Sequence, residues 1–164
     1  MVRPLPPGPE SDPLALRDQV VLIVDDEEDV RESLRDVLEA YIEHVDVIAA
    51  GSGREALAVL AERPVDLIVS DYKMPGMNGL DFLAQARTLA PSVPRVIITA
   101  FPDMELAIRS INMAGIENFF TKPLDRELVI EVVRSHLFER RATELRGRAF
   151  ARSLEVLRQR TDGR

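Results

Sequence analysis

The stretch from Val65 to Gly79, which reads VDLIVSDYKMPGMNG, constrains the fold of this chain more than any other. Its apolar start has the length of a strand and leads into Ser70-Asp71, and Asn78 behind the Pro-Gly turn is a typical helix cap. A buried strand followed by a loop and a helix presents its last side chains at the carboxyl edge of a sheet, where open α/β sheets bind ligands. Aspartate is also common in ordinary turns, so this stretch alone leaves the role of Asp71 open.

The remainder of the chain alternates predicted strands with predicted helices. The strand candidates are Val20–Val24, His44–Ala50, Val65–Val69, Arg95–Thr99 and Glu117–Phe120. Helices are expected behind the acidic run Asp25–Asp29, from the Ser52/Glu55 capping box to about Arg63, from about Gly79 to Leu89, from Asp103 to Gly115, and from Asp125 onward. This α/β alternation predicts a doubly wound, five-stranded parallel sheet covered on both faces by five helices. Its simplest strand order is 2-1-3-4-5, and the last helix extends C-terminally.

Length and composition divide the chain into three parts. Its 164 residues suit one domain with an appendage, and a hydrophobic content of 46% is ample for a core. Residues 1–18 are proline-rich and predicted to form a flexible leader, residues 19–138 form the domain, and residues 139–164 form an arginine-rich helical tail. The chain has no cysteine, no apolar run long enough to span a bilayer and no signal-peptide core. We therefore expect a cytoplasmic protein without membrane association.

Charge is unevenly distributed along the chain. The segment from Glu139 onward holds eight arginines and four acidic residues, a net charge of +4, whereas the whole chain carries −7. The preceding 138 residues therefore carry −11. An acidic body repels nucleic acid, so any binding to DNA would have to come from the tail.

Polar side chains end four of the predicted strands on the same side of the sheet. Asp25 and Asp26 follow the first strand, Asp71 the third, Thr99 the fourth and Lys122 the fifth. Three carboxylates in one place repel one another unless a cation lies among them, and Mg²⁺ is the ion that fits such oxygen ligands best. With Lys122 as a second positive charge, this edge is equipped to move a phosphoryl group onto a carboxylate, and Asp71 is the central candidate for the nucleophile.

Each of these residues also has an ordinary structural explanation. Acidic residues stabilise a helix N-terminus, threonine is common in strands, and a lysine beside a proline usually faces solvent. The joint placement of such residues at four strand ends is much harder to obtain by chance, and it favours a functional site.

From about Val20 to Phe138, nearly three-quarters of the chain, the sequence resembles the receiver domains of bacterial two-component response regulators. The matching motifs are VLIVDDEEDVR, DLIVSDYKMPGMNG, VIITAF and FFTKPLD, in the order that this family has. The resemblance implies the fold of the chemotaxis response regulator and a switch that is phosphorylated by a sensor histidine kinase. It implies no enzyme with substrate turnover, since a receiver catalyses only its own phosphorylation and dephosphorylation.

The resemblance also implies a ligand set for Mg²⁺. Asp71 looks like the phosphoacceptor, Asp26 like a direct metal ligand, and Asp25 like a ligand that assists partly through water. The backbone carbonyl of Lys73 would be the third protein ligand. No position of the site departs from the family's pattern.

Around the phosphoacceptor, Thr99 is similar to the family's switch hydroxyl and Lys122 to its phosphate-binding lysine, whose bond to Pro123 is expected to be cis. Phe119 stands where the family has a rotating switch aromatic, and a plain core phenylalanine is the alternative interpretation. The resemblance implies that phosphorylation repacks the face made by the fourth helix, the fifth strand and the fifth helix. Receivers typically use this face for dimerisation or partner binding.

The tail has the pattern of a short coiled coil. Apolar residues recur there at alternating four- and three-residue steps, with Arg152 interrupting, at Phe138, Ala142, Leu145, Ala149 and Val156. Such a seam would join two copies or lead to an output domain, and a solvated arginine-rich helix is the alternative. The chain is then a stand-alone regulator or a fragment of a longer one, and the long last helix favours the fragment.

Two other functions compete with a receiver. A Mg²⁺-dependent phosphoaspartyl hydrolase similar to the haloacid dehalogenases would have an Asp-x-Asp pair after the first strand, which the adjacent Asp25-Asp26 does not reproduce. A DNA-binding regulator would act through the basic tail, which has no helix-turn-helix pattern and little aromatic content.

Overall fold

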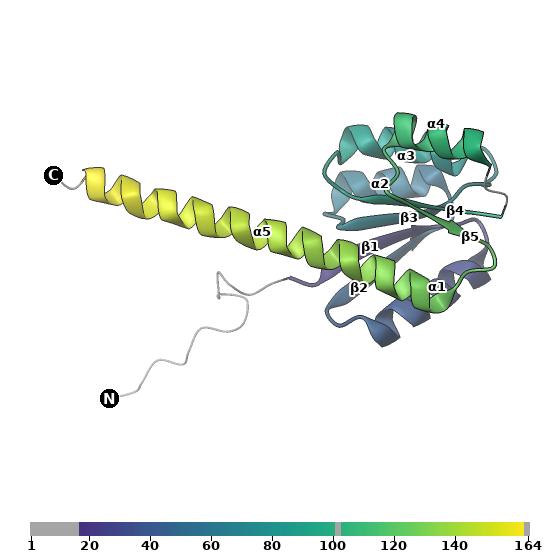
Figure 1. Cartoon of the computed structure of the whole chain (residues 1–164), viewed down its shortest axis with the longest axis horizontal. Coiled ribbons are helices and arrows are strands. Elements are labelled where there is room, and N and C mark those ends of the chain that lie inside the picture. The colour runs from purple at the N-terminus through teal and green to yellow at the C-terminus, as the bar shows by residue number, and fades with distance from the viewer. Residues whose placement is uncertain (1–16, 101–102, 163–164) are drawn as a thin grey trace.

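The computed structural model describes residues 17–100 and 103–162, which form one parallel sheet with helices on both of its faces (Figure 1). The strands are β1 (Gln19–Val24), β2 (Val45–Ala50), β3 (Leu67–Asp71), β4 (Arg95–Thr99) and β5 (Asn118–Thr121). The helices are α1 (Glu28–Tyr41), α2 (Gly53–Glu62), α3 (Gly79–Leu89), α4 (Met104–Ala114) and α5 (Arg126–Asp162). The sheet order β2-β1-β3-β4-β5 confirms the predicted doubly wound topology.

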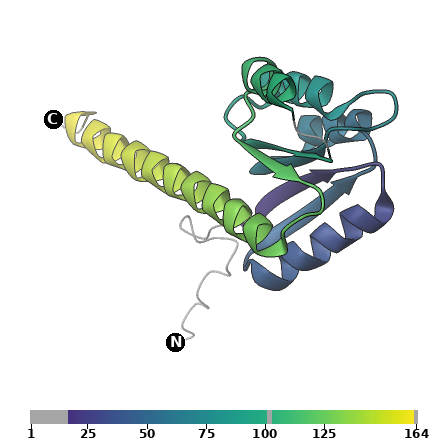
Figure 2. The same ribbon diagram turned by 45° about the vertical axis from the view of Figure 1, so that its right-hand side comes forward.

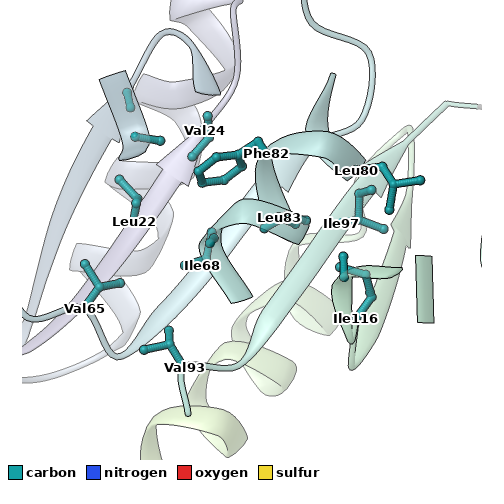
Figure 3. Close-up of a cluster of buried hydrophobic side chains, with 14 of the residues drawn as sticks. Leu22, Val24, Val65, Ile68, Leu80, Phe82, Leu83, Val93, Ile97 and Ile116 are labelled. Atoms are coloured by element: carbon teal, nitrogen blue, oxygen red, sulfur yellow. The ribbon is translucent and has the colours of Figure 1, made fainter. Parts of the chain in front are cut away.

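The central strands are buried along their whole length because helices cover both faces of the sheet. Every residue of β1, β3 and β4 is buried, as their continuous apolar runs predicted. On one face, Leu22, Ile68 and Ile97 pack with Phe82 and Leu83 of α3 (Figure 3). On the other face, the strands pack against α1 and α5 through Val21, Ile23, Val69, Ile98, Leu34, Leu38, Val129, Val133 and Leu137. The sheet thus lies between two apolar layers, and the polar site residues lie at the ends of its strands.

The polar residues at three predicted helix starts act as caps. The side chains of Ser52, Asn78 and Asp125 accept hydrogen bonds from backbone N–H groups in the first turns of α2, α3 and α5. Gly115, directly after α4, has a φ of 60°, the left-handed conformation expected of a glycine that ends a helix. These local signals account for the good agreement between predicted and observed helices.

Some strand boundaries differ from the predicted ones by one or two residues. β3 begins at Leu67 and continues through Asp71, so the candidate phosphoacceptor is the last residue of the strand. His44 lies outside β2, since its φ of 56° belongs to the left-handed region and not to a strand. β5 is shifted by one residue, to Asn118–Thr121.

Helix α5 is 37 residues long, about 56 Å, and its C-terminal part projects away from the sheet (Figure 1, Figure 2). Val129, Val133 and Leu137 hold its first turns in the core, and Phe138 is already 73% exposed. The predicted tail is therefore helical as far as Asp162, while residues 1–16 of the predicted leader lie outside the described residues. In the part of the chain that the structure describes, no helix is both long and apolar enough to cross a membrane.

Candidate functional site

Three carboxylates come together at the carboxyl edge of the sheet. Asp71 ends β3, while Asp25 and Asp26 directly follow β1, the strand paired with β3. One ligand oxygen from each side chain lies within 4.8 Å of the other two. Asp25 and Asp71 are buried, with exposed fractions of 1% and 5%, whereas Asp26 is exposed. The cluster therefore combines two desolvated carboxylates with one that faces solvent.

Lys122 supplies a positive charge to this edge. Its Nζ lies 2.9 Å from Oδ1 of Asp71, 3.7 Å from Oδ2 of Asp25 and 3.8 Å from Oε1 of Glu27. The residue follows β5, and its peptide bond to Pro123 is cis, as expected. Burial lowers the pKa of Lys122, but its hydrogen bond to Asp71 and the charges of the three carboxylates outweigh burial and raise it above the ordinary value. The lysine is therefore fully charged at neutral pH.

Asp25 has one carboxylate oxygen that is buried without a hydrogen bond from the described residues. Burial raises its pKa, and this effect outweighs the hydrogen bond that its Oδ1 accepts from the Glu27 N–H at 2.9 Å. The charges of Asp71 and Asp26 raise the pKa further, against the charge of Lys122. The buried Oδ2 accepts no hydrogen bond from any described residue. A buried oxygen without a donor, next to two more carboxylates, fits a divalent cation with oxygen ligands such as Mg²⁺.

The other predicted site residues lie close by in the topology. Thr99 ends β4, next to β3, is 4% exposed, and accepts a hydrogen bond from the Lys122 N–H at its carbonyl (3.0 Å). Phe119 of β5 pairs with Ile97 of β4, is half-buried, and packs on the same face of the sheet as α3. Lys73 lies in the loop between β3 and α3 with its side chain exposed. The fold thus brings Thr99 and Lys122 to the edge where Asp71 lies.

Further contacts at this edge involve residues that the sequence did not single out. Glu27 forms the third ion pair of Lys122, and Arg31 of α1 donates a hydrogen bond to the carbonyl of Asp25 (2.8 Å). Gly79, the first residue of α3, packs so closely on β3 that a Cβ atom there would overlap the carbonyl oxygen of Asp71. Glu27 and Arg31 lie within the motif around Asp25, and Gly79 within the motif around Asp71. Only the packing of the elements assigns them these contacts.

Comparison with known proteins relates this edge to one family. The profile of the response regulator receiver domain matches residues 21–134. The hydrogenase transcriptional regulatory protein HoxA of Cupriavidus necator is 37% identical over 114 residues, which are 70% of this chain and 23% of that protein. The response regulator protein PilR of Pseudomonas aeruginosa is 38% identical over 120 residues, which are 71% of this chain and 26% of that protein. The chain thus spans about a quarter of the length of the curated relatives it matches.

Solved structures agree with the sequence relatives. The signal receiver domain of an HD domain-containing protein from Pseudomonas fluorescens has a TM-score of 0.73 and 29% identity, covering 80% of this chain and 95% of that one. A CheY-like response regulator receiver domain protein from Methanospirillum hungatei has a TM-score of 0.70 and 28% identity, covering 76% of this chain and 98% of that one. Because the family profile covers more than half of its length, this chain belongs to the response regulator receiver domain family of two-component systems.

Proposed function

We propose that this chain is a phosphorylation-activated, cytoplasmic receiver, and that a sensor histidine kinase phosphorylates it on Asp71. One observation carries the proposal. The buried carboxylate that ends β3 lies 2.9 Å from the ammonium of Lys122 and within 4.8 Å of two further carboxylates. A structural ion pair alone would not need these additional carboxylates, which repel Asp71 in the absence of a bound cation.

The chemistry follows from the groups at this edge. A carboxylate oxygen of Asp71 attacks the phosphorus of a phosphohistidine, the phosphorus–nitrogen bond breaks, and the imidazole leaves with the bonding electron pair. Lys122, already held at Asp71, neutralises charge on the phosphoryl oxygens. Asp25, Asp26, Asp71 and the backbone carbonyl of Lys73 are the proposed ligands of Mg²⁺, which when bound supplies further positive charge for the phosphoryl group. The chain then catalyses only its own phosphorylation and dephosphorylation.

The proposed switch begins with the charge of about −1.5 to −2 that a phosphoryl group adds at Asp71. The hydroxyl of Thr99 is expected to donate a hydrogen bond to an oxygen of the phosphoryl group. Because the Thr99 carbonyl accepts a hydrogen bond from the Lys122 N–H, the ends of β4 and β5 would move together. Phe119 of β5, half-buried on the face of the sheet that α3 covers, is the proposed aromatic that repacks. The readout is then a rearranged face of α4, β5 and α5.

The tail is proposed as a dimerisation helix beyond a receiver that ends near residue 138. The side of α5 that packs on the sheet is marked by Val129, Val133 and Leu137. At about 100° per residue, the predicted seam falls on roughly the opposite side, at Phe138, Ala142, Leu145 and Ala149. A second copy would therefore reach the seam without displacing the core. Arg152 still interrupts the seam, and the side chain of Val156 lies outside the described residues.

The alternative functions have less support from the described contacts. For a DNA-binding tail the arginines should be available, yet Arg140 binds Ser92, Arg141 binds the carbonyl of Arg17, and Arg148 pairs with Glu144. For a phosphoaspartyl hydrolase, the chain would have to turn over small phosphate esters repeatedly. Both alternatives remain outcomes of the experiment below.

The decisive experiment is phosphorylation by acetyl phosphate with Mg²⁺, followed by intact-mass spectrometry. Wild type is expected to gain one phosphoryl group, Asp71→Asn none, and Asp36→Asn, an exposed aspartate of α1, as much as wild type. Failure of the wild type to accept phosphate would refute the receiver proposal. Light scattering with beryllofluoride and Mg²⁺ then tests the dimer, since an unchanged mass would refute only that part. A salt-sensitive gel shift with DNA, or multiple turnover of phosphate esters, would favour the alternatives instead.

A further inference from the structure

A third buried carboxylate, Asp66, lies at the edge of the sheet opposite Asp71. Asp66 directly precedes β3, and its side chain is 1% exposed. It accepts two hydrogen bonds from Arg17 (2.6 and 2.8 Å) and one from the backbone N–H of Val20 (2.8 Å), and Nε of Arg140 lies 3.6 Å from it. Burial raises the pKa of Asp66, but these bonds and charges prevail and lower it below the ordinary value. Asp66 is therefore ionised at neutral pH, and none of its contacts serves the site at Asp71.

The partners of Asp66 connect it to α5 at the point where this helix leaves the domain. Arg140 follows Leu137, the last buried residue of α5 among those whose side chains are described, by less than one turn. Besides its ion pair with Asp66, Arg140 donates hydrogen bonds to the carbonyl and the hydroxyl of Ser92 (2.9 and 3.1 Å), between α3 and β4. Arg141 donates to the carbonyl of Arg17 (2.8 Å). Segments that lie far apart in the sequence thus meet on one turn of the helix.

Farther along, the described hydrogen bonds of α5 run within the helix itself, and only the charge of Glu144 still acts on Arg17 of the domain. Arg146 donates to Thr143, Arg148 pairs with Glu144, and Ser153 donates to the carbonyl of Ala149. The helix projects from the domain beyond this point (Figure 2). Among the described residues, the contacts of Arg140 and Arg141 are therefore the last direct hydrogen bonds that orient the projecting part.

We propose that Asp66 is the centre of a clamp, completed by Arg17 and Arg140, that fixes the direction in which the tail helix leaves the receiver. Among the described side chains of α5, Leu137 is the last buried apolar one, and a helix without tertiary contacts frays or bends easily in water. A carboxylate held between two arginines from different segments opposes such bending, because any tilt of the helix breaks the contacts of Arg140 with Asp66 and with Ser92 together. The receiver and the first turns of the tail then move as one body. A rearrangement at the start of α5 is passed along the helix instead of being lost at a flexible joint.

The clamp exists without a phosphoryl group, so its test does not depend on the proposed phosphorylation. The sequence has no cysteine, which allows spin labels at two introduced cysteines, Glu62→Cys in α2 and Glu155→Cys in α5, both at exposed positions. The distance distribution between the labels, measured by double electron–electron resonance, reports the direction of the tail. An excess of unlabelled protein removes distances between copies.

Arg140→Gln and Asp66→Asn should each widen this distribution at least about twofold. The reference is the doubly labelled parent protein, in which Arg17, Asp66 and Arg140 are all present. Arg148→Gln is the matched control, because Arg148 pairs only within the helix, and it should leave the width unchanged. Arg140 is partly exposed, so its substitution tests the clamp even where Asp66→Asn fails to fold. Widths and mean distances that stay at the parent values in Arg140→Gln, with the fold intact by circular dichroism, would overturn the proposal. Equal widening in Arg148→Gln would also overturn the proposal, because loss of any arginine from α5 would then widen the distance distribution.

Discussion

Replacing Gly79 with alanine tests how tightly α3 packs against the strand that carries Asp71. The added Cβ would overlap the carbonyl oxygen of Asp71 and lie 2.9 Å from Cα of Tyr72, where ordinary contacts begin at 3.4 Å. Both neighbours are backbone, so no side-chain rotation relieves the overlap. The start of α3 must move away from β3, and with it the loop that contains Lys73.

The cost of this movement can be worked out from the contacts that it breaks. The hydrogen bond from the Gly79 N–H to the carbonyl of Tyr72 (2.7 Å) and the cap at Asn78 are each worth about 1 kcal/mol. Displacing Leu80 and Phe82, which are fully buried, adds about 1–3 kcal/mol. The free energy of unfolding should therefore fall by about 3–5 kcal/mol, which lowers Tm by about 6–20 °C.

Gly147→Ala is the matched control, measured by the same thermal unfolding followed by circular dichroism. Gly147 lies in the exposed part of α5 with nothing within 4 Å of an added Cβ, and alanine favours a helix over glycine by about 1 kcal/mol. This variant should keep the Tm of the wild type or raise it slightly, and should gain helical signal. The reasoning about Gly79 would be refuted by a Tm within about 2 °C of the wild type, well below the decrease derived above. A similar decrease in both variants would indicate an effect common to any glycine substitution.

Three further predictions concern charged groups. Arg95→Met removes a buried guanidinium that donates hydrogen bonds to the carbonyls of Ala114 (2.7 Å) and Val93 (2.6 Å). The free energy of unfolding, measured with urea, should fall by about 2–4 kcal/mol. Arg109→Met, at an exposed position of α4, should leave it unchanged. Acidification should weaken the fold through Asp66. Its folded-state pKa lies below the unfolded value of about 3.9, so its stabilisation is complete above that value and is lost as the pH falls through the folded-state pKa. Asp66→Asn should remove this part of the pH dependence of the free energy of unfolding, measured with denaturant. If the variant loses stability at acidic pH as much as the wild type does, Asp66 is not the group responsible. Lys122→Met removes the ammonium that competes with a cation for Asp71. Calorimetric titration should therefore show Mg²⁺ binding on the order of tenfold tighter, while the reaction with acetyl phosphate becomes slower. Weaker Mg²⁺ binding would argue against a site that the lysine and the metal share.

Local patterns in the sequence predicted the elements and their order because the signals for them are short-range. The apolar runs of β1, β3 and β4 reflect burial on both faces, and the caps at Ser52, Asn78 and Asp125 lie within a few residues of the N–H groups they bind. A parallel sheet then brings all carboxyl ends of its strands to one edge. The grouping of Asp71 with Thr99 and Lys122 therefore followed from the order of elements alone.

Contacts between distant segments depended on how the elements pack. The sequence presents Asp25 and Asp26 as adjacent equals, yet only Asp25 is buried with an oxygen that accepts no hydrogen bond from the described residues. Asp66 was merely one polar residue in an apolar run, and its bonds to Arg17 and its ion pair with Arg140 join positions 49 and 74 residues away. The need for glycine at position 79 was equally hidden, because it arises from the approach of α3 to the end of β3.

The sequence by itself thus determined the α/β fold, the order of the strands and the chemical groups at the carboxyl edge, since each of these follows from local periodicity and from the geometry of parallel strands. The tertiary structure alone decided which carboxylate is desolvated, which lysine or arginine side chain each carboxylate contacts, and where the last helix is held as it leaves the domain. Those properties depend on the register and approach of elements far apart in the chain, which no local pattern encodes.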